Sequence, residues 1–210
     1  MIKVEKFILG DYMENCYLIT DADTGEQALI DPGYESMELF QKLSNNHENN
    51  LKYILLTHGH FDHIGFVLKV YALTHAKIAI GEKEKDFLTQ KKLNLSQFTM
   101  TQPLAPIDAD ILLKNNELLP LGNSSITYVS TPGHTQGSGC YIVDNNIFTG
   151  DTLMKCSMGR TDFPTGNDTE MKHSLHKISE LTKNYTIYPG HGDNSTLDYE
   201  KSHNPYLGVL

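Results

Sequence analysis

The sequence predicts an α/β (α+β) protein that folds as one globular domain over residues 1–210. Short apolar runs of strand length alternate with helical segments in both halves of the chain. With 210 residues, 39% of them hydrophobic, and no low-complexity tract, the chain can build one sizeable core. Several strand-like runs end at Gly or Pro followed by His or Asp, a pattern that favours a site at one edge of a sheet.

In the first half, strand-like segments surround helical ones. Strands are expected at 3–8, 15–20, 27–31, 51–57 and 77–80. Helices are expected at 36–46, 63–74 and, as a short segment, 82–88. The stretch 89–110 is long for a loop, and two interpretations are open: it covers the active site, or it is partly helical and packs against the sheet.

The second half repeats this alternation. Strands are expected at 117–120, 125–130, 139–144, 146–149 and 185–188, with one helix at 169–181. The segment 159–168 is rich in turn-forming residues and is expected to form a pocket wall.

A dense group of metal-binding residue types, THGHFDH at 57–63, follows an apolar run. His58 and His60, two apart on an extended segment, point the same way, whereas Asp62 and His63 follow where the chain turns into a helix. Two metal positions are therefore possible. Imidazole and carboxylate donors suit zinc, iron or manganese, and they exclude the structural zinc sites that are rich in thiolates. The pattern therefore favours a catalytic metal site over a structural one.

Three later segments share this design. Each is an apolar strand-like run that ends at Gly and is followed by one possible ligand: His134, Asp151 and His191. Gly and Pro let the backbone turn sharply there, so side chains from four strands can converge at one sheet edge.

These segments resemble the metallo-β-lactamase fold hydrolases, and most closely their compact glyoxalase II-like (hydroxyacylglutathione hydrolase-like) branch. The resemblance rests on THGHFDH, NCYL at 15–18, DPG at 31–33, TPGHTQGS at 131–138, GDTL at 150–153, GRTDFP at 159–164 and PGHG at 189–192. It implies a four-layer αββα sandwich of two mixed β-sheets flanked by helices, with metals at one edge.

The resemblance also implies a ligand set for two divalent metal ions, with zinc as first choice and iron or manganese as alternatives. The first ion would be bound by His58, His60 and His134, the second by Asp62, His63 and His191, and Asp151 would bridge both. A water shared by two cations loses its proton near neutral pH and becomes the attacking hydroxide.

One ligand and two neighbouring residues receive further predictions. Asp62 would also act catalytically, by orienting the shared water or by taking its proton. Asp31 and Thr57 are expected to accept hydrogen bonds from ligand imidazoles, because a ligating His usually donates its other N–H to an oxygen. For Asp31 a second interpretation is open, in which it caps the turn before Pro32 and Gly33.

The function implied is hydrolysis of thioesters, with hydroxyacyl-thiol conjugates such as S-lactoylglutathione as the first choice of substrate. The resemblance places Arg160 at the thiol carrier, where it would bind substrate; pairing with Asp162 or Asp168 is the alternative. The chain departs from glyoxalase II proper because only 19 residues follow His191, where those enzymes carry a helical domain. This departure leaves the identity of the thiol carrier open.

Other functions compete with this one. A mononuclear-iron persulfide dioxygenase would use His58, His134 and Asp151 as a facial triad. A lactam or ester hydrolase of the same fold is a further alternative. In a non-enzymatic alternative the metal site is vestigial and the domain only binds partners.

Composition excludes other classes of function. A formal net charge of −9 disfavours nucleic-acid binding, and no apolar run is long enough to span a membrane. Cys16, Cys140 and Cys156 are odd in number and form no CxxC pair, which favours reduced thiols and a cytoplasmic location. Cys156 follows Asp151 closely enough to approach the pocket, although a structural role is preferred. The expected partner is a small-molecule thioester; the oligomeric state is not predicted.

Overall fold

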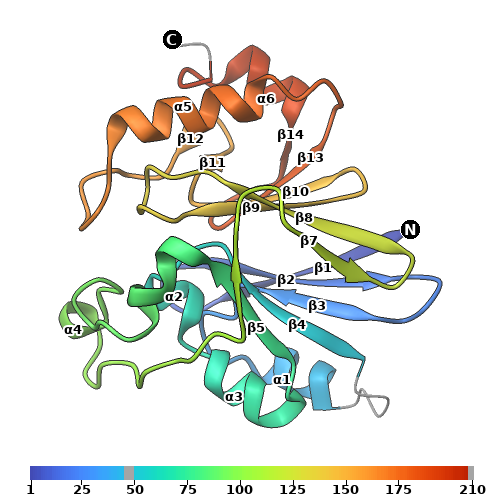
Figure 1. The fold of residues 1–210 in the computed structure, drawn as a ribbon, viewed down its shortest axis with the longest axis vertical. Helices are drawn as coiled ribbons and strands as arrows, with labels where there is room; N and C mark the ends of the chain where they lie inside the picture. The colour runs from blue at the N-terminus through green and yellow to red at the C-terminus, as the bar shows by residue number, and fades with distance from the viewer. Residues whose placement is uncertain (45–49, 208–210) are drawn as a thin grey trace.

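The computed structural model describes residues 1–44 and 50–207. Two six-stranded sheets face each other, and helices cover the outer face of each (Figure 1). From bottom to top the layers are α1 and α3, the N-terminal sheet, the C-terminal sheet, and α5 with α6. The four-layer αββα sandwich is thereby confirmed.

The N-terminal sheet is mixed. Its strands, in spatial order, are β1 (Ile2–Leu9), β2 (Glu14–Asp21), β3 (Gln27–Ile30), β4 (Leu51–Leu56), β5 (Lys77–Gly81) and β6 (Ile111–Leu113). The pairs from β1 to β3 are antiparallel and those from β3 to β6 are parallel.

The C-terminal sheet is mixed as well. Its spatial order is β14 (Ser195–Thr196), β13 (Thr186–Pro189), β10 (Asn146–Gly150), β9 (Gly139–Val143), β8 (Ser124–Ser130) and β7 (Leu118–Leu121). The pair β10 and β13 is parallel, and the other pairs are antiparallel. A small hairpin of β11 (Leu153–Met154) and β12 (Ser157–Met158) follows β10.

Helices connect and cover the strands. They are α1 (Met37–Ser44), α2 (Phe61–Ile64), α3 (Val67–Thr74), the 3₁₀ helix η1 (Glu82–Leu88), α4 (Ser96–Thr99), α5 (Asp168–Ser179) and α6 (Leu197–His203). The side chain of Asn167 caps α5 by accepting a hydrogen bond from the amide of Glu170.

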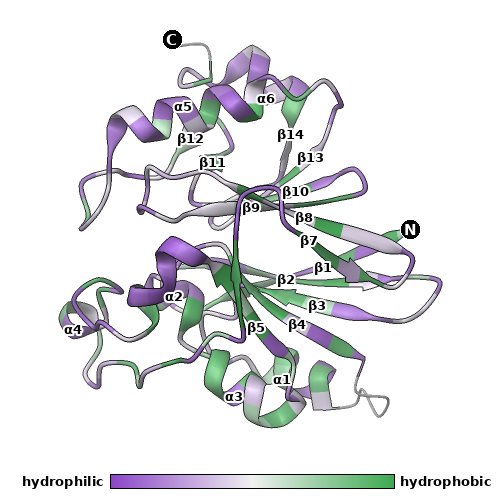
Figure 2. Cartoon of the chain, in the orientation of Figure 1, coloured by the Kyte–Doolittle hydropathy of each residue, from purple (hydrophilic) through white to green (hydrophobic). Residues whose placement is uncertain are grey.

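Three apolar clusters hold the layers together. One lies between the N-terminal sheet and α1 and α3, the second between the two sheets, and the third between the C-terminal sheet and α5 and α6. Figure 2 shows hydrophobic colour along the strands, whereas α5 alternates between hydrophilic and hydrophobic residues. This alternation is typical of a helix with one face on a sheet.

Two tyrosine hydroxyls join the sheets beside the strand ends that carry the predicted ligands. The hydroxyl of Tyr141, on β9, donates to the carbonyl of Leu56 at 2.9 Å. The hydroxyl of Tyr17, on β2, donates to the carbonyl of Pro189 at 2.7 Å. Because both bonds are buried, they fix the end of β4 and the end of β13 relative to the opposite sheet.

The single helix predicted at 63–74 is wrong, because the structure has two helices, α2 and α3. The amide of Phe66 donates to the carbonyl of Pro32 at 2.9 Å instead of continuing the helical ladder. Gly33 packs so tightly on this turn that a Cβ atom there would lie 1.5 Å from the carbonyl oxygen of Asp62. The contact with the 31–33 turn therefore ends α2 after one turn, just beyond the ligand positions.

Other differences are smaller. In the helix predicted at 36–46, α1 occupies 37–44, and residues 45 and 46 lie outside the described residues. The stretch 89–110 combines both interpretations, since it contains α4 and lines the pocket through Leu95, Phe98 and Thr99. The helix α6 and the short strands β6, β11, β12 and β14 were not predicted.

Within the described ranges, none of the helices is both long enough and apolar enough to cross a membrane.

Candidate metal centre

The seven predicted ligand side chains converge at one edge of the sandwich. They come from the segment after β4, from α2, and from the turns that follow β8, β10 and β13. Their donor atoms form overlapping groups whose members lie within 4.8 Å of one another. One group consists of His58, His60 and His134, and another of Asp62, His63 and His191. These are the two trios that the resemblance implies, and we call them the first and second clusters.

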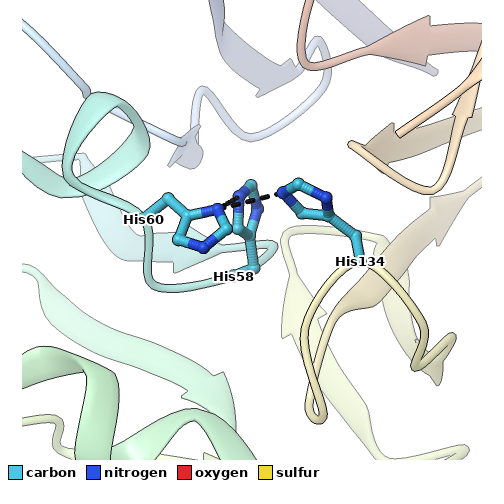
Figure 3. A group of neighbouring side chains, drawn as sticks. All are labelled: His58, His60 and His134. Carbon is cyan, nitrogen blue, oxygen red and sulfur yellow. Dashed lines mark hydrogen bonds between the residues drawn. The ribbon is translucent and has the colours of Figure 1, made fainter. Parts of the chain in front are cut away.

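The first cluster consists only of imidazoles (Figure 3). Nε2 of His58 lies 3.1 Å from Nδ1 of His60, which lies 3.0 Å from Nε2 of His134. All three residues are buried, with 1–3% of their surface exposed. Three ring nitrogens thus face one point.

Hydrogen bonds on the outer side of this cluster determine two tautomers. The hydroxyl of Thr57 donates to Asp31 at 2.6 Å, so its oxygen is left to accept a hydrogen bond from Nδ1 of His58 at 3.1 Å. Nδ1 of His134 lies 2.6 Å from the carbonyl of Arg160, which can only accept. We infer that both imidazoles carry their proton on Nδ1 and direct the Nε2 lone pair inward.

The second cluster adds a carboxylate. Nε2 of His191 lies 3.5 Å from Oδ2 of Asp62, and Nε2 of His63 lies 4.0 Å from the same oxygen. Nδ1 of His63 contacts Asp31 at 3.0 Å, and Nδ1 of His191 contacts the carbonyl of Tyr12 at 3.1 Å. Both outer partners accept hydrogen bonds, so these Nε2 lone pairs also point inward.

Asp151 lies between the clusters. Its Oδ1 is 3.6 Å from Nε2 of His63 and 3.7 Å from Nε2 of His191. Its Oδ2 is 3.6 Å from Nε2 of His134. One carboxylate therefore presents one oxygen to each cluster, which is the arrangement expected of a bridging ligand.

The two clusters shift imidazole pKa values in opposite directions. Burial and the neighbouring imidazoles place the pKa values of His58 and His60 well below their usual range. Burial would also lower the pKa of His63, but the carboxylates of Asp151, Asp62 and Asp31 outweigh it and raise that pKa. His58 and His60 are therefore neutral, while the second cluster has an excess of carboxylates whose negative charge a cation neutralises.

The donor atoms fit bound metal ions. Nε2 of His63 and Oδ1 of Asp151 are buried and have no hydrogen-bond partner among the described residues. Leaving buried polar atoms unpaired costs about 1–3 kcal/mol each, so their grouping needs a compensating ligand. Imidazoles with inward lone pairs and aspartate oxygens are suitable donors for zinc, iron or manganese.

Two glycines explain why the strand ends approach so closely. Gly150 has a φ of +48°, and a Cβ atom there would lie 2.4 Å from Oγ1 of Thr57. A Cβ atom at Gly190 would lie 2.4 Å from Oδ1 of Asp151. Any larger residue at either position would force atoms of the site to move. The close backbone approach predicted for these Gly-bounded strand ends is therefore present.

Asp31 and Thr57 make the predicted contacts with imidazoles. Besides His63, Asp31 receives hydrogen bonds from the amide and the hydroxyl of Thr57. This network favours the metal-site interpretation of Asp31 over the turn cap.

Sequence reasoning missed Glu84, a fully buried carboxylate on η1. Its Oε2 accepts from the amide of Gly59 at 2.8 Å, and its Oε1 accepts from the amide of Gly137 at 2.9 Å. Gly59 separates His58 from His60, and Gly137 follows His134, so Glu84 joins the two segments that carry the first cluster. Its sequence neighbourhood is a run of charged residues and contains no signal of burial.

Glu14 was also missed. It is fully buried, neither carboxylate oxygen has a hydrogen-bond partner within the described chain, and it lies beside Asp31 and His63. Burial, opposed by His63, raises its pKa well above the usual range, which favours a protonated side chain.

Arg160 lines the pocket above the clusters and also forms the alternative ion pair. Its Nε and one terminal nitrogen donate to the two carboxylate oxygens of Asp162, each at 2.6 Å. Its guanidinium carbon lies 4.1 Å from the centre of the Phe163 ring.

Cys156 is exposed and does not line this pocket. Its backbone amide donates a hydrogen bond to the carboxylate of Glu200, which fits the structural role preferred for this residue.

Comparisons with known proteins agree with this geometry. A family model described as the metallo-beta-lactamase superfamily matches residues 9–191. A Haemophilus influenzae protein named hydroxyacylglutathione hydrolase GloC is 36% identical over 215 residues, which cover 98% of each chain. The solved structure of BLEG-1, described as a B3 metallo-beta-lactamase, is 34% identical with a TM-score of 0.90 and covers 100% of both chains. TTHA1623 in a di-iron-bound form is 28% identical with a TM-score of 0.84, covering 97% of this chain and 100% of that one.

Proposed function

Since the chain belongs to the metallo-β-lactamase superfamily, we propose that it is a hydrolase of small-molecule thioesters that uses two divalent metal ions. Hydroxyacyl-thiol conjugates are the proposed substrates; S-lactoylglutathione belongs to this class, and the preferred thiol carrier is a separate property of the cavity. The relative named hydroxyacylglutathione hydrolase GloC supports this choice of reaction. Zinc is the proposed metal, with iron or manganese as alternatives; the di-iron form of TTHA1623 supports a two-metal site.

One observation carries the proposal: two adjacent clusters share the carboxylate of Asp151, with Oδ2 toward His134 and Oδ1 toward His63 and His191. His58, His60 and His134 would hold one ion, and Asp62, His63 and His191 the other. When bound, such a pair of cations supplies a hydroxide at neutral pH and polarises a carbonyl.

Asp62 is the residue that we propose for orienting the attacking water. It lines the pocket, and only 13% of its side chain is exposed. Burial would raise its pKa, but the charges of His63 and His191 outweigh it and hold the pKa below its usual range. Asp62 is therefore ionised and acts as a hydrogen-bond acceptor. The leaving thiolate needs little protonation, because thiols have pKa values of about 8.5.

Two other reactions are compatible with parts of the site. A persulfide dioxygenase needs one iron on His58, His134 and Asp151, and would leave the Asp62, His63 and His191 cluster without a role. The likeness to BLEG-1, a B3 metallo-beta-lactamase by its description, favours lactam hydrolysis as a second candidate. Oxygen uptake with glutathione persulfide tests the former, and nitrocefin turnover tests the latter.

We also propose that the reaction takes place in the cytoplasm. Cys16, Cys140 and Cys156 are all free thiols, and two of them are buried. Unpaired thiols suit a reducing compartment.

Hydrolysis of two lactoyl thioesters by the zinc-loaded protein tests the proposed function. One substrate is S-D-lactoylglutathione, and the other carries the same lactoyl group on N-acetylcysteamine. We expect turnover that is lost in His134→Ala while circular dichroism shows an unchanged fold. Turnover retained in this variant, or no hydrolysis of either thioester with two ions bound, would reject the assignment.

A further inference from the structure

A cavity of about 590 Å³ opens above the two clusters and is mostly apolar away from them. Asp62, His134, Asp151 and His191 form its polar floor. The walls come from separate parts of the chain: Tyr12 and Phe61, Leu95 and Phe98, Met154 and Met158. This volume is within the range of small-molecule sites and is far larger than a lactoyl group. The larger part of a lactoyl thioester, the thiol carrier, must therefore occupy most of the cavity.

Away from the metal-binding floor, the walls of the cavity have little charge with which to recognise an anionic carrier. Among the described residues that line it, Arg160 is the only lysine or arginine. Both oxygens of Asp162 already neutralise its guanidinium group, which also lies over the Phe163 ring. A substrate carboxylate would have to break this bidentate pair, and the formal net charge of −9 opposes its approach.

Phe98 offers apolar surface at the same cavity. It lies on α4 (Figure 1), and just before that helix the carbonyl of Asn94 accepts a hydrogen bond from the amide of Phe61 on α2. This residue is 68% exposed, although it lines the cavity. An exposed aromatic side chain beside a reaction centre can stabilise a ligand that covers it. It also contributes little to the core, so it can be replaced without unfolding the protein.

We propose that the cavity binds thioesters through an uncharged, apolar thiol carrier and discriminates against anionic carriers such as glutathione. This inference rests on the proposed thioesterase function. Arg160 then contacts the carrier through the flat face of its guanidinium group rather than as a receptor for a carboxylate.

The test compares kcat/KM for lactoyl thioesters of benzyl mercaptan, N-acetylcysteamine and glutathione. Each value is divided by the rate of uncatalysed alkaline hydrolysis, which removes differences in leaving-group reactivity. We expect the benzyl thioester to exceed the glutathione thioester at least about tenfold, since each buried methylene group contributes a factor of roughly three to four. Equal values, or a preference for glutathione, would overturn the inference while leaving thioester hydrolysis established. Hydrolysis of none of the three would reject the proposed function and the inference together.

Two variants test the causes separately. Phe98→Ser should reduce the advantage of the benzyl thioester several-fold, mainly through KM, because it removes apolar wall. Asp162→Asn should raise the relative kcat/KM for the glutathione thioester, because it releases the charge of Arg160. If neither ratio changes, the apolar wall and the neutralised arginine do not select the carrier, and the inference is wrong.

Discussion

The two clusters of the candidate metal centre differ in charge and in access to solvent. The first has three buried imidazoles and a lowered pKa at His58 and His60. The second includes Asp62 and has a raised pKa at His63, and the side chain of His191 is 24% exposed. The first cluster borders the cavity through His60 and His134, but its deep burial suits it to holding an ion with little exposure to solvent. The acidic second cluster faces the cavity, where water and substrate exchange.

This contrast has a physical origin in the fold. The first cluster is assembled from both sheets, through the segment after β4 and the turn after β8, and the buried carboxylate of Glu84 joins the two. The second cluster lines the pocket through Asp62 and His191, and the neighbouring carboxylates, Asp31 and Asp151, repel each other unless cations or protons are present.

The largest expected effect comes from the residue that the clusters share. Asp151→Asn replaces one of its two anionic donor oxygens with an amide nitrogen that cannot accept a hydrogen bond or bind a cation. We expect thioester turnover to fall on the order of 10³-fold and both ions to bind more weakly. Metal content after dialysis and kcat are the measurements. Asp193→Asn is the matched control, because Asp193 is an exposed carboxylate paired with Lys155. Equal effects in the two variants would refute the shared role.

Removing one imidazole from each cluster compares them directly. His134→Ala should abolish turnover, because His134 is only 2% exposed and water does not readily replace so deeply buried a ligand. His191→Ala should reduce it only about 10–100-fold, since a water can replace a partly exposed ligand. His134→Ala should lose one bound ion, whereas His191→Ala should keep both ions, one of them bound more weakly. If His191→Ala is the more damaging change, the assigned difference between the clusters is reversed.

Glu84 supports only the first cluster, so its substitution should weaken one ion selectively. In Glu84→Gln the amide nitrogen cannot accept from Gly59 or Gly137, and one ligand segment loses its partner. Affinity for the tighter of the two ions should fall about 10–100-fold. Competition with a chelator measures it, and Glu82→Gln, an exposed change on the same η1 helix, is the control. An unchanged affinity would rule out a positioning role for Glu84.

The pH dependence of stability gives an independent view of Glu84. Burial raises its pKa to about 7, although hydrogen bonds from Thr135, Gly59 and Gly137 oppose the rise. In the unfolded chain the pKa is about 4.3, so between these values the folded state retains a proton that the unfolded state has lost. The free energy of unfolding should therefore decrease as pH rises through this window, by roughly 3 kcal/mol in total. Urea unfolding at several pH values should show this loss of stability in the wild type and not in Glu84→Gln. The same dependence of the free energy of unfolding on pH in both proteins would contradict the prediction.

The smallest effect is expected at Arg160, which lies outside both clusters. Its pair with Asp162 is exposed, so Arg160→Ala should hardly change the thermal midpoint. As a pocket wall, Arg160 should affect KM more than kcat. An unchanged KM would exclude substrate contact by this side chain.

The sequence was most informative where local spacing determines geometry. THGHFDH and the three Gly-bounded strand ends identified all seven converging side chains, because a strand end and a sharp turn place the next residue at the sheet edge. Glu84 could not be distinguished from the exposed Glu82 nearby, since burial of one and not the other depends on how η1 packs on the 57–60 and 131–138 segments. The division of 63–74 into two helices depends on the contact with Gly33. The prediction of the αββα layers rested on the family resemblance, because the periodicity of apolar residues does not determine how sheets and helices stack.

The central claim is that two ions, one in each cluster, act together on a thioester. The most direct measurement is a zinc titration of the metal-depleted protein during hydrolysis of a lactoyl thioester. We predict that turnover remains low at the first equivalent of zinc and rises with the second, as the more exposed cluster fills. Full turnover at one equivalent, or none with two ions bound, would contradict the claim.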